Sequence, residues 1–201
     1  MDKAPQMLLI ICEGKTEAIY FSILKKRFRL PTYVKILPDI ESEKYSSIGQ
    51  HERLIDAAGE YRINYAKELE ISEEEIEVWV VCDRDNYRDS FVKLRDYADE
   101  NGIKLAFSDP QFENFLLQHF SLSKSVKAGR EVEQELSYEI LSVNQYYGPY
   151  RKNNLEWLDD MIDKKHSIVR NAAKNASVFG NHTKKPFFTV DKLIFRLLDL
   201  M

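Results

Sequence analysis

The sequence predicts an α/β protein with a mostly parallel four-stranded sheet flanked by helices, followed by a helical C-terminal extension. Residues 7–12 and 77–82, which are apolar apart from Glu77, are each stopped by carboxylates, and such runs are typical of strands buried on both faces. Stretches with helical spacing separate the strand candidates, which favours a parallel sheet. Beyond residue 122 the pattern is helical. We therefore expect residues 1–122 to form the α/β core and residues 123–201 to form a helical extension packed on it.

The first elements follow from apolar spacing and from turn residues. Residues 7–12 predict a strand, and the polar segment 13–16 predicts a turn. A helix follows, with apolar residues at helical spacing, namely Ile19, Tyr20, Ile23, Leu24 and Phe28. Residues 34–37 predict a short strand, which Pro38 ends. After a polar loop, residues 51–69 carry one apolar face and predict a second helix.

The third and fourth strands repeat this order. Residues 77–82 predict a buried strand, and residues 88–101 a helix that ends at Asn101 and Gly102. Residues 103–107 predict the fourth strand, and Ser108, Asp109 and Pro110 are expected to start another helix. In the remainder, residues 130–142, 154–177 and 187–200 predict helices, with a loop over 143–153.

Composition fits a globular protein of the cytoplasm. The 201 residues are 44% hydrophobic, which is enough for a core at this length. The apolar run 7–12 is far shorter than the roughly 20 residues that a membrane span needs, so we expect no membrane association. Cys12 and Cys82 end apolar runs and predict buried free thiols, as in a reducing cytosol. They are too few for a zinc site.

Charge is spread unevenly along the chain. Residues 1–119 carry 16 basic and 23 acidic residues, whereas residues 120–201 carry 13 and 10. The later basic excess comes from Arg151, Lys152, Lys164, Lys165, Arg170, Lys174, Lys184 and Lys185. An anionic partner approaching the C-terminal half and ordinary solvated helix faces explain this pattern equally well.

Carboxylates follow the buried strands. Glu13 and Glu17 follow the first, Asp83 and Asp85 the third, and Glu113 follows the fourth. Ligands of open parallel sheets collect at the carboxyl ends of strands, where the strand order reverses. With a strand order of 2-1-3-4 these acids would meet in one crevice, where they would repel each other unless a cation lies between them.

The ligand chemistry favours a hard ion. Oxygen donors alone select Mg²⁺ or Mn²⁺ over zinc, and one or two ions fit this number of carboxylates. Each acid also has an ordinary structural explanation, because Asp and Glu commonly cap helices or face the positive end of the helix dipole. Glu113 could equally be an exposed ion-pair partner. Residues 14–16 are no Walker A motif, because the upstream glycine is missing.

Four motifs resemble those of a known family. The segment 11–21, ICEGKTEAIYF, resembles the EGxTExxYF opening of RloB-like proteins. The segment 80–85, VVCDRD, is similar to their DxD strand end, and the segment 108–120, SDPQFENFLLQHF, to their SNPxFExWLLLHF block. The segment 150–153, YRKN, resembles their YxK element. The four occur in the family's order over nearly the whole chain.

The resemblance implies a Toprim-like fold, related to the nuclease domains of OLD-family proteins and to topoisomerase and primase centres. It implies acid/base or metal-binding work for Glu13 and metal binding by Asp83 and Asp85. Glu17 and Glu113 would complete the metal ligands. Lys152 would stabilise developing charge. The residues expected to contact nucleic acid are Lys15, Arg84, Arg151 and Lys152.

The functional expectation is therefore a Mg²⁺- or Mn²⁺-dependent nuclease acting on DNA or RNA. RloB-like proteins are commonly encoded beside an ATPase in anti-phage systems, so an ATPase partner is expected, and a homo-oligomer stays open. The alternative is a non-catalytic regulatory subunit that binds a metal or a nucleotide, and a primase-like activity is less favoured. The chain departs from the family pattern at Asp109, Asn114 and Phe115. These departures remove no carboxylate, although Asp109 adds a negative charge.

Overall fold

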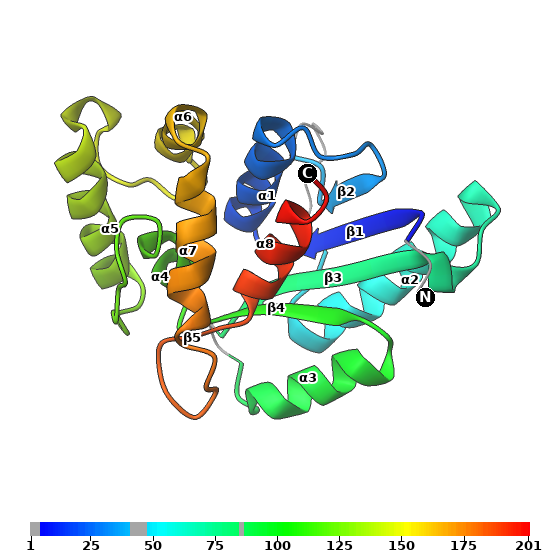
Figure 1. The fold of residues 1–201 in the computed structure, drawn as a ribbon. Helices are drawn as coiled ribbons and strands as arrows, with labels where there is room; N and C mark the ends of the chain where they lie inside the picture. The colour runs from blue at the N-terminus through cyan, green and yellow to red at the C-terminus, as the bar shows by residue number, and fades with distance from the viewer. Residues whose placement is uncertain (1–4, 41–47, 85–86) are drawn as a thin grey trace.

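The computed structural model describes residues 5–40, 48–84 and 87–201. Its centre is a sheet that has five strands in the described part of the chain, in the order β2-β1-β3-β4-β5 (Figure 1). The strands are β1 Met7–Cys12, β2 Val34–Leu37, β3 Ile76–Asp83, β4 Lys104–Asp109 and β5 Phe187–Phe188. The first four are parallel, and β5 runs antiparallel to β4. The α/β class and the strand order 2-1-3-4 are thus confirmed.

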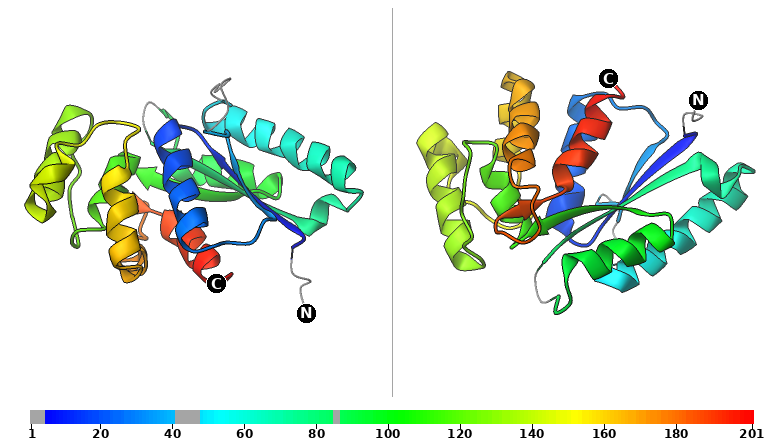
Figure 2. Two further views of the ribbon diagram at one scale, coloured as in Figure 1. Left: turned by 90° about the horizontal axis from the view of Figure 1, so that it is seen from above. Right: turned by 60° about the horizontal axis from the view of Figure 1, so that its bottom comes forward.

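Helices cover both faces of the sheet. The helices are α1 Lys15–Arg27, α2 His51–Leu69, α3 Phe91–Glu100, α4 Phe112–Leu117, α5 Arg130–Val143, α6 Glu156–Lys164, α7 Ser167–Ser177 and α8 Val190–Leu198. Short 3₁₀ turns occupy Glu73–Glu75 and Gln145–Tyr147. Helices α2 and α3 lie on one face and α1 and α8 on the other (Figure 2). Helices α4 to α7 lie beyond the carboxyl ends of the strands (Figure 1).

Alternation along the central strands produces two hydrophobic clusters. In β1, Leu8 and Ile10 face the cluster under α1 and α8, whereas Leu9 and Ile11 face the cluster under α2 and α3. Successive side chains of a strand point to opposite faces, so a strand buried on both sides must be apolar at every position. That requirement is the physical reason for the unbroken apolar run in β1 and for the run Val78 to Cys82 in β3, where Glu77 is the exception and pairs with Arg196 of α8.

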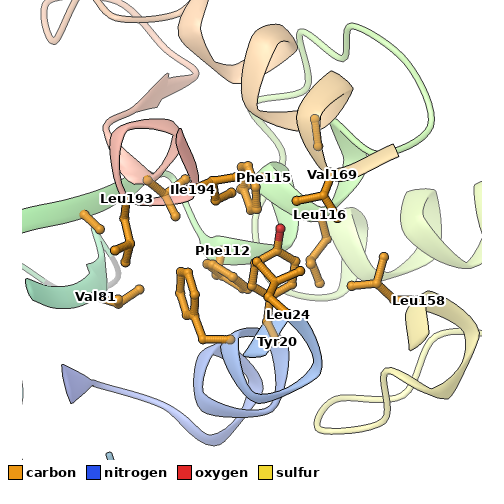
Figure 3. Packing of buried hydrophobic residues seen from close by; sticks show 14 of the residues in the cluster. Tyr20, Leu24, Val81, Phe112, Phe115, Leu116, Leu158, Val169, Leu193 and Ile194 are labelled. Atoms are coloured by element: carbon orange, nitrogen blue, oxygen red, sulfur yellow. The ribbon is translucent and has the colours of Figure 1, made fainter. Parts of the chain in front are cut away.

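The larger cluster continues into the C-terminal helices. Tyr20 of α1 packs against Phe112 and Phe115 of α4, with ring centroids 5.5 and 5.6 Å apart. Leu193 of α8 and Val169 of α7 belong to the same cluster (Figure 3). The residues after 122 therefore share one core with the α/β part, and a division of the chain near residue 122 stays a prediction.

Three expected elements differ from those observed. The expected helix 154–177 is two helices, because Lys165 leaves helical geometry with φ −154° and ψ 88°. Residues 187–188 form β5 rather than the start of a helix, so the sheet has a fifth strand. Ser108 and Asp109 belong to β4, and α4 begins only at Phe112.

Both cysteines are buried and free. Cys12 belongs to one hydrophobic cluster and Cys82 to the other, so the two thiols lie on opposite faces of the sheet. Among the described residues, no helix is both long and apolar enough to cross a membrane.

Candidate active site

A pocket of about 160 Å³ lies at the carboxyl ends of β1 and β3. We call it the carboxylate pocket, and its lining is Glu13, Gly14, Lys15, Thr16, Glu17, Gln50, Asp83, Phe112, Glu113 and Lys152. Four of the five expected metal ligands thus line one pocket, together with two of the four expected nucleic-acid contacts. The fifth ligand, Asp85, lies outside the described residues.

The pairing of β1 with β3 brings the first two acids to the same edge. Cys12 is in register with Val81, and the Glu13 amide donates to the Val81 carbonyl at 2.9 Å. The chain therefore leaves both strands side by side, at the point where the strand order reverses. Asp83 is fixed further, because its Oδ2 accepts a hydrogen bond from the amide of Phe112 at 3.4 Å.

Glu17 reaches the pocket past a residue that has no side chain. It lies in the first turn of α1 and is only 6% exposed. A Cβ placed on Gly14 would lie 2.5 Å from Oε2 of Glu17, which is closer than a Cβ approaches an oxygen to which it is not bonded. The backbone of Gly14 has an ordinary φ of −115° and does not itself require glycine. Glycine is required at position 14 because of where the Glu17 carboxylate lies.

Glu113 is held by a tyrosine from the C-terminal part of the chain. Its Oε1 accepts a hydrogen bond from the hydroxyl of Tyr150 at 2.9 Å, and both side chains are buried. Burial, followed by the negative charge of Glu113, raises the pKa of Tyr150. Tyr150 therefore stays protonated at neutral pH and acts as a donor to the carboxylate.

The loop that contains Tyr150 also places Lys152 at the pocket. Thr16 at the start of α1 donates to Oδ1 of Asn153 at 2.9 Å, and Asn153 has a positive φ of 66°. Lys152 lies between this anchor and Tyr150, so the loop is attached to the core on both sides of the lysine. The sequence identified Tyr150 and Asn153 only as parts of a motif, because their partners are 37 and 137 residues away.

Two predicted nucleic-acid contacts lie elsewhere. Arg151 lines a separate hollow with Tyr146, Tyr147 and Trp157. Arg84 follows β3, where its amide donates to the Ser108 carbonyl at 2.9 Å, and it is not among the described residues that line the carboxylate pocket. The later basic stretch is partly neutralised, because Lys164 pairs with Asp160 and Lys185 with Asp109.

Comparison with family models gives a match to the RloB-like protein family over residues 8–197. The chain belongs to the RloB-like family. Neither the curated proteins nor the solved structures gave a match. The mostly parallel sheet of this RloB-like chain, flanked by helices, is consistent with a Toprim-like fold.

The carboxylates of this RloB-like protein contribute to the raised pKa values of its two cysteine thiols. Burial is the main reason why the pKa of Cys82 is raised well above its ordinary value, and the charges of Glu13, Asp83 and Glu17 raise it further. Burial and then Glu17 do the same for Cys12. Both thiols therefore stay protonated at neutral pH.

The donor set of the pocket fits a hard divalent cation. Glu13, Glu17, Asp83 and Glu113 offer carboxylate oxygens alone, which Mg²⁺ and Mn²⁺ prefer. Within the described ranges, however, no three His, Cys, Asp or Glu side chains are grouped closely enough to hold an ion as they stand. Binding by these residues would require their carboxylates to move closer together, or a ligand from residues 85–86.

His119, at the end of the third family motif, belongs to the core. It is 5% exposed, its Nδ1 donates to the Leu116 carbonyl at 3.1 Å, and its Nε2 accepts from the Tyr20 hydroxyl at 3.2 Å. The carbonyl can only accept, which fixes the tautomer. Burial lowers the pKa of His119 to about 4, so the ring is neutral at physiological pH.

Proposed function

We propose that this protein hydrolyses phosphodiester bonds of nucleic acid with the help of Mg²⁺ or Mn²⁺. The observation that carries the proposal is the single pocket shared by Glu13, Glu17, Asp83 and Glu113, with Lys15 and Lys152 at its rim. Acids supply metal ligands and a general base, and lysines attract phosphate. Membership of the RloB-like family supports the same reading.

Each side chain has a distinct task in this proposal. A divalent ion, when bound, would neutralise charge on the phosphate and orient a water molecule. Asp83, Glu17 and Glu113 would hold the ion, and Glu13 would accept the proton of the attacking water. Lys152 would stabilise the negative charge that develops on the phosphate oxygens. Tyr150 keeps Glu113 oriented through its hydrogen bond.

The test replaces single carboxylates by their amides. Glu13→Gln and Asp83→Asn are expected to lower cleavage of plasmid DNA and tRNA with Mn²⁺ by at least about 100-fold, while circular dichroism and thermal unfolding stay close to those of the unmodified protein. Glu131→Gln, at an exposed position on α5, is the matched control and should cut normally. Full cleavage by both pocket variants would show that the site assignment is wrong.

A second candidate function is a regulatory subunit that binds a metal or nucleotide without catalysis. Carboxylates and lysines that line one pocket fit the binding of a metal ion or a nucleotide as well as they fit catalysis. Mn²⁺ binding without cleavage of any substrate, with and without an ATPase encoded beside it, would support this alternative. Cleavage that appears only with the ATPase would instead support a nuclease activated by its partner in anti-phage defence.

A further inference from the structure

A second, larger hollow lies over the edge strand β2 and is lined by cations. Its volume is about 620 Å³. Lys25 and Lys26 of α1, Arg29 after α1, and Lys35 of β2 all line it, with Ser22, Leu30, Ile36, Leu37, Asp39 and Tyr65 completing the wall. Four cations face one acid here, in the half of the chain whose total charge is negative. We call this hollow the basic pocket.

The four cations have no ion pair within the parts of the chain that the structure describes. Arg27, on the same helix, shows the contrast: its guanidinium pairs with Asp159 and with Asp163 of α6. Lys25 donates to a backbone carbonyl, that of Val34, at 2.6 Å. Its pKa is lowered, first by burial and then by the charge of Lys35. Among the described residues that line this hollow, four cations thus stand against the single carboxylate of Asp39.

An ordinary structural role explains part of this cluster. Basic residues in the last turn of a helix stabilise its dipole, and Lys25 and Lys26 occupy the last turn of α1. That role does not extend to Lys35, which belongs to β2, or to Arg29, which follows the helix with a φ of 50°. Two separate elements thus bring cations to one hollow, at the cost of mutual repulsion.

Helix α1 links the basic pocket to the carboxylate pocket. Lys15 lines the carboxylate pocket, and Ser22 and Lys26 line the basic pocket. At 100° per residue, positions 22 and 26 each fall within roughly 20° of position 15 around the helix. The three residues therefore share one face, and a rise of 1.5 Å per residue separates Lys15 from Lys26 by roughly 16 Å. One flexible anionic chain can reach both pockets along this face.

We infer that the basic pocket binds backbone phosphates of the same nucleic-acid strand whose scissile phosphate occupies the carboxylate pocket. The inference rests on the proposed function and adds a substrate requirement to it. The strand must extend past Lys15 along α1 to be held tightly. Leu37 and Tyr65 add apolar surface to the wall of the hollow, against which a base can pack.

The test removes three charges and measures strand binding. Lys26, Arg29 and Lys35 are exposed, so a triple change to Gln leaves the core intact. The matched control removes three charges from exposed positions outside both pockets, by changing Lys67, Arg88 and Lys192 to Gln. Both triple variants carry Glu13→Gln in addition, so that the proposed cleavage is prevented. Fluorescence anisotropy then follows a labelled single strand of about 12 nucleotides with Mg²⁺ at several salt concentrations.

The basic-pocket variant is expected to bind the strand at least about 10-fold more weakly than the Glu13→Gln parent. The slope of the logarithm of its binding constant against the logarithm of salt concentration should fall by about 2 in magnitude, as the loss of three phosphate contacts requires. The control should change the affinity by less than about 3-fold. Equal affinities of the two triple variants would overturn the inference. So would tight binding of inorganic tripolyphosphate to the basic pocket without loss of strand binding in the variant, because the pocket would then serve a small phosphate compound.

Gel analysis of the same samples keeps the two proposals apart. Cleavage of the strand by the Glu13→Gln parent would contradict the proposed function alone, and the binding comparison would then be made without Mg²⁺, so that the strand stays intact. Intact strand together with unchanged binding by the basic-pocket variant would contradict this inference alone.

Discussion

Glu17 reaches the carboxylate pocket only because residue 14 has no side chain. The atom in the way of a Cβ at that position is the end of the Glu17 side chain, at 2.5 Å, and not backbone. A flexible side chain can move aside at little cost to the fold. A methyl group at residue 14 should therefore lower cleavage and metal affinity in the pocket while changing the free energy of unfolding little.

Gly14→Ala is expected to change the free energy of unfolding by less than about 1 kcal/mol, because the φ of −115° suits alanine. Cleavage and Mn²⁺ affinity should each fall by about 10-fold or more, since a displacement of about 1 Å at a reacting centre has large effects. Urea unfolding, Mn²⁺ titration and a cleavage assay measure the three quantities. Gly59→Ala on α2, where nothing lies within 4 Å of the new methyl group, is the control and should leave both functions unchanged.

His119 predicts a pH dependence of stability. Its folded pKa of about 4 lies below the ordinary value of 6.5 because of burial. The neutral ring is favoured in the folded state, so its contribution is complete above about pH 6.5 and is lost as the pH falls towards 4. The loss amounts to about 3 kcal/mol. Asp191, whose pKa is raised by burial to about 6, has the opposite slope over part of this range.

Comparison with His119→Gln isolates this effect, because Asp191 is present in both proteins. Glutamine can accept the hydrogen bond of Tyr20 but does not titrate. The difference in unfolding free energy between the two proteins, measured with urea from about pH 7 to about pH 4, should shrink as the pH falls. A constant difference would show that His119 is not the titrating group.

At the scale of elements, Thr189, which lies between β5 and α8, holds this part of the chain against β4. The Thr189 hydroxyl accepts a hydrogen bond from the Phe107 amide at 2.8 Å and donates to the Leu105 carbonyl at 2.9 Å. The Thr189 amide donates to the Phe107 carbonyl at 2.8 Å. Strand β5 is only two residues long, and Thr189 extends its hydrogen bonding to β4 by one further residue.

Thr189→Val should lower the free energy of unfolding by about 2–3 kcal/mol, because it leaves the buried Phe107 amide without its acceptor. Thr189→Ser keeps the hydroxyl and should cost less than about 1 kcal/mol. Chemical denaturation of both variants measures the difference. Equal stability of the two would mean that the hydroxyl does not support the β4–β5 edge.

The elements that the sequence predicted well are those fixed by local pattern. Burial on both faces makes β1 apolar throughout and β3 apolar from Val78 to Cys82, and Pro38 marks the end of β2. The strand Phe187–Phe188 carries no such pattern, since two aromatic residues fit a helix equally well. The break between α6 and α7 at Lys165 is likewise not predictable from the sequence, because the apolar residues of 154–177 keep a helical spacing and the segment contains no glycine or proline.

At the scale of the whole molecule, the site joins segments far apart in the chain. Strand order and the position of the acids after the strands were enough to predict that Glu13, Glu17, Asp83 and Glu113 line one pocket. The hydrogen bonds of Tyr150 and Asn153 were not predictable, because they depend on how residues 148–154 fold back onto α1 and α4. The basic pocket was also missed, since its cations come from α1 and β2 in a net acidic half of the chain.

A crystal structure of the protein grown with Mn²⁺ tests the central claim most directly. Anomalous scattering locates the ion independently of any assumed ligand. The account predicts at least one Mn²⁺ bound by Asp83 beside Glu13, with Glu17 or Glu113 drawn towards it from their present positions. Ordered pocket residues without a manganese peak, or manganese bound only elsewhere on the chain, would contradict it.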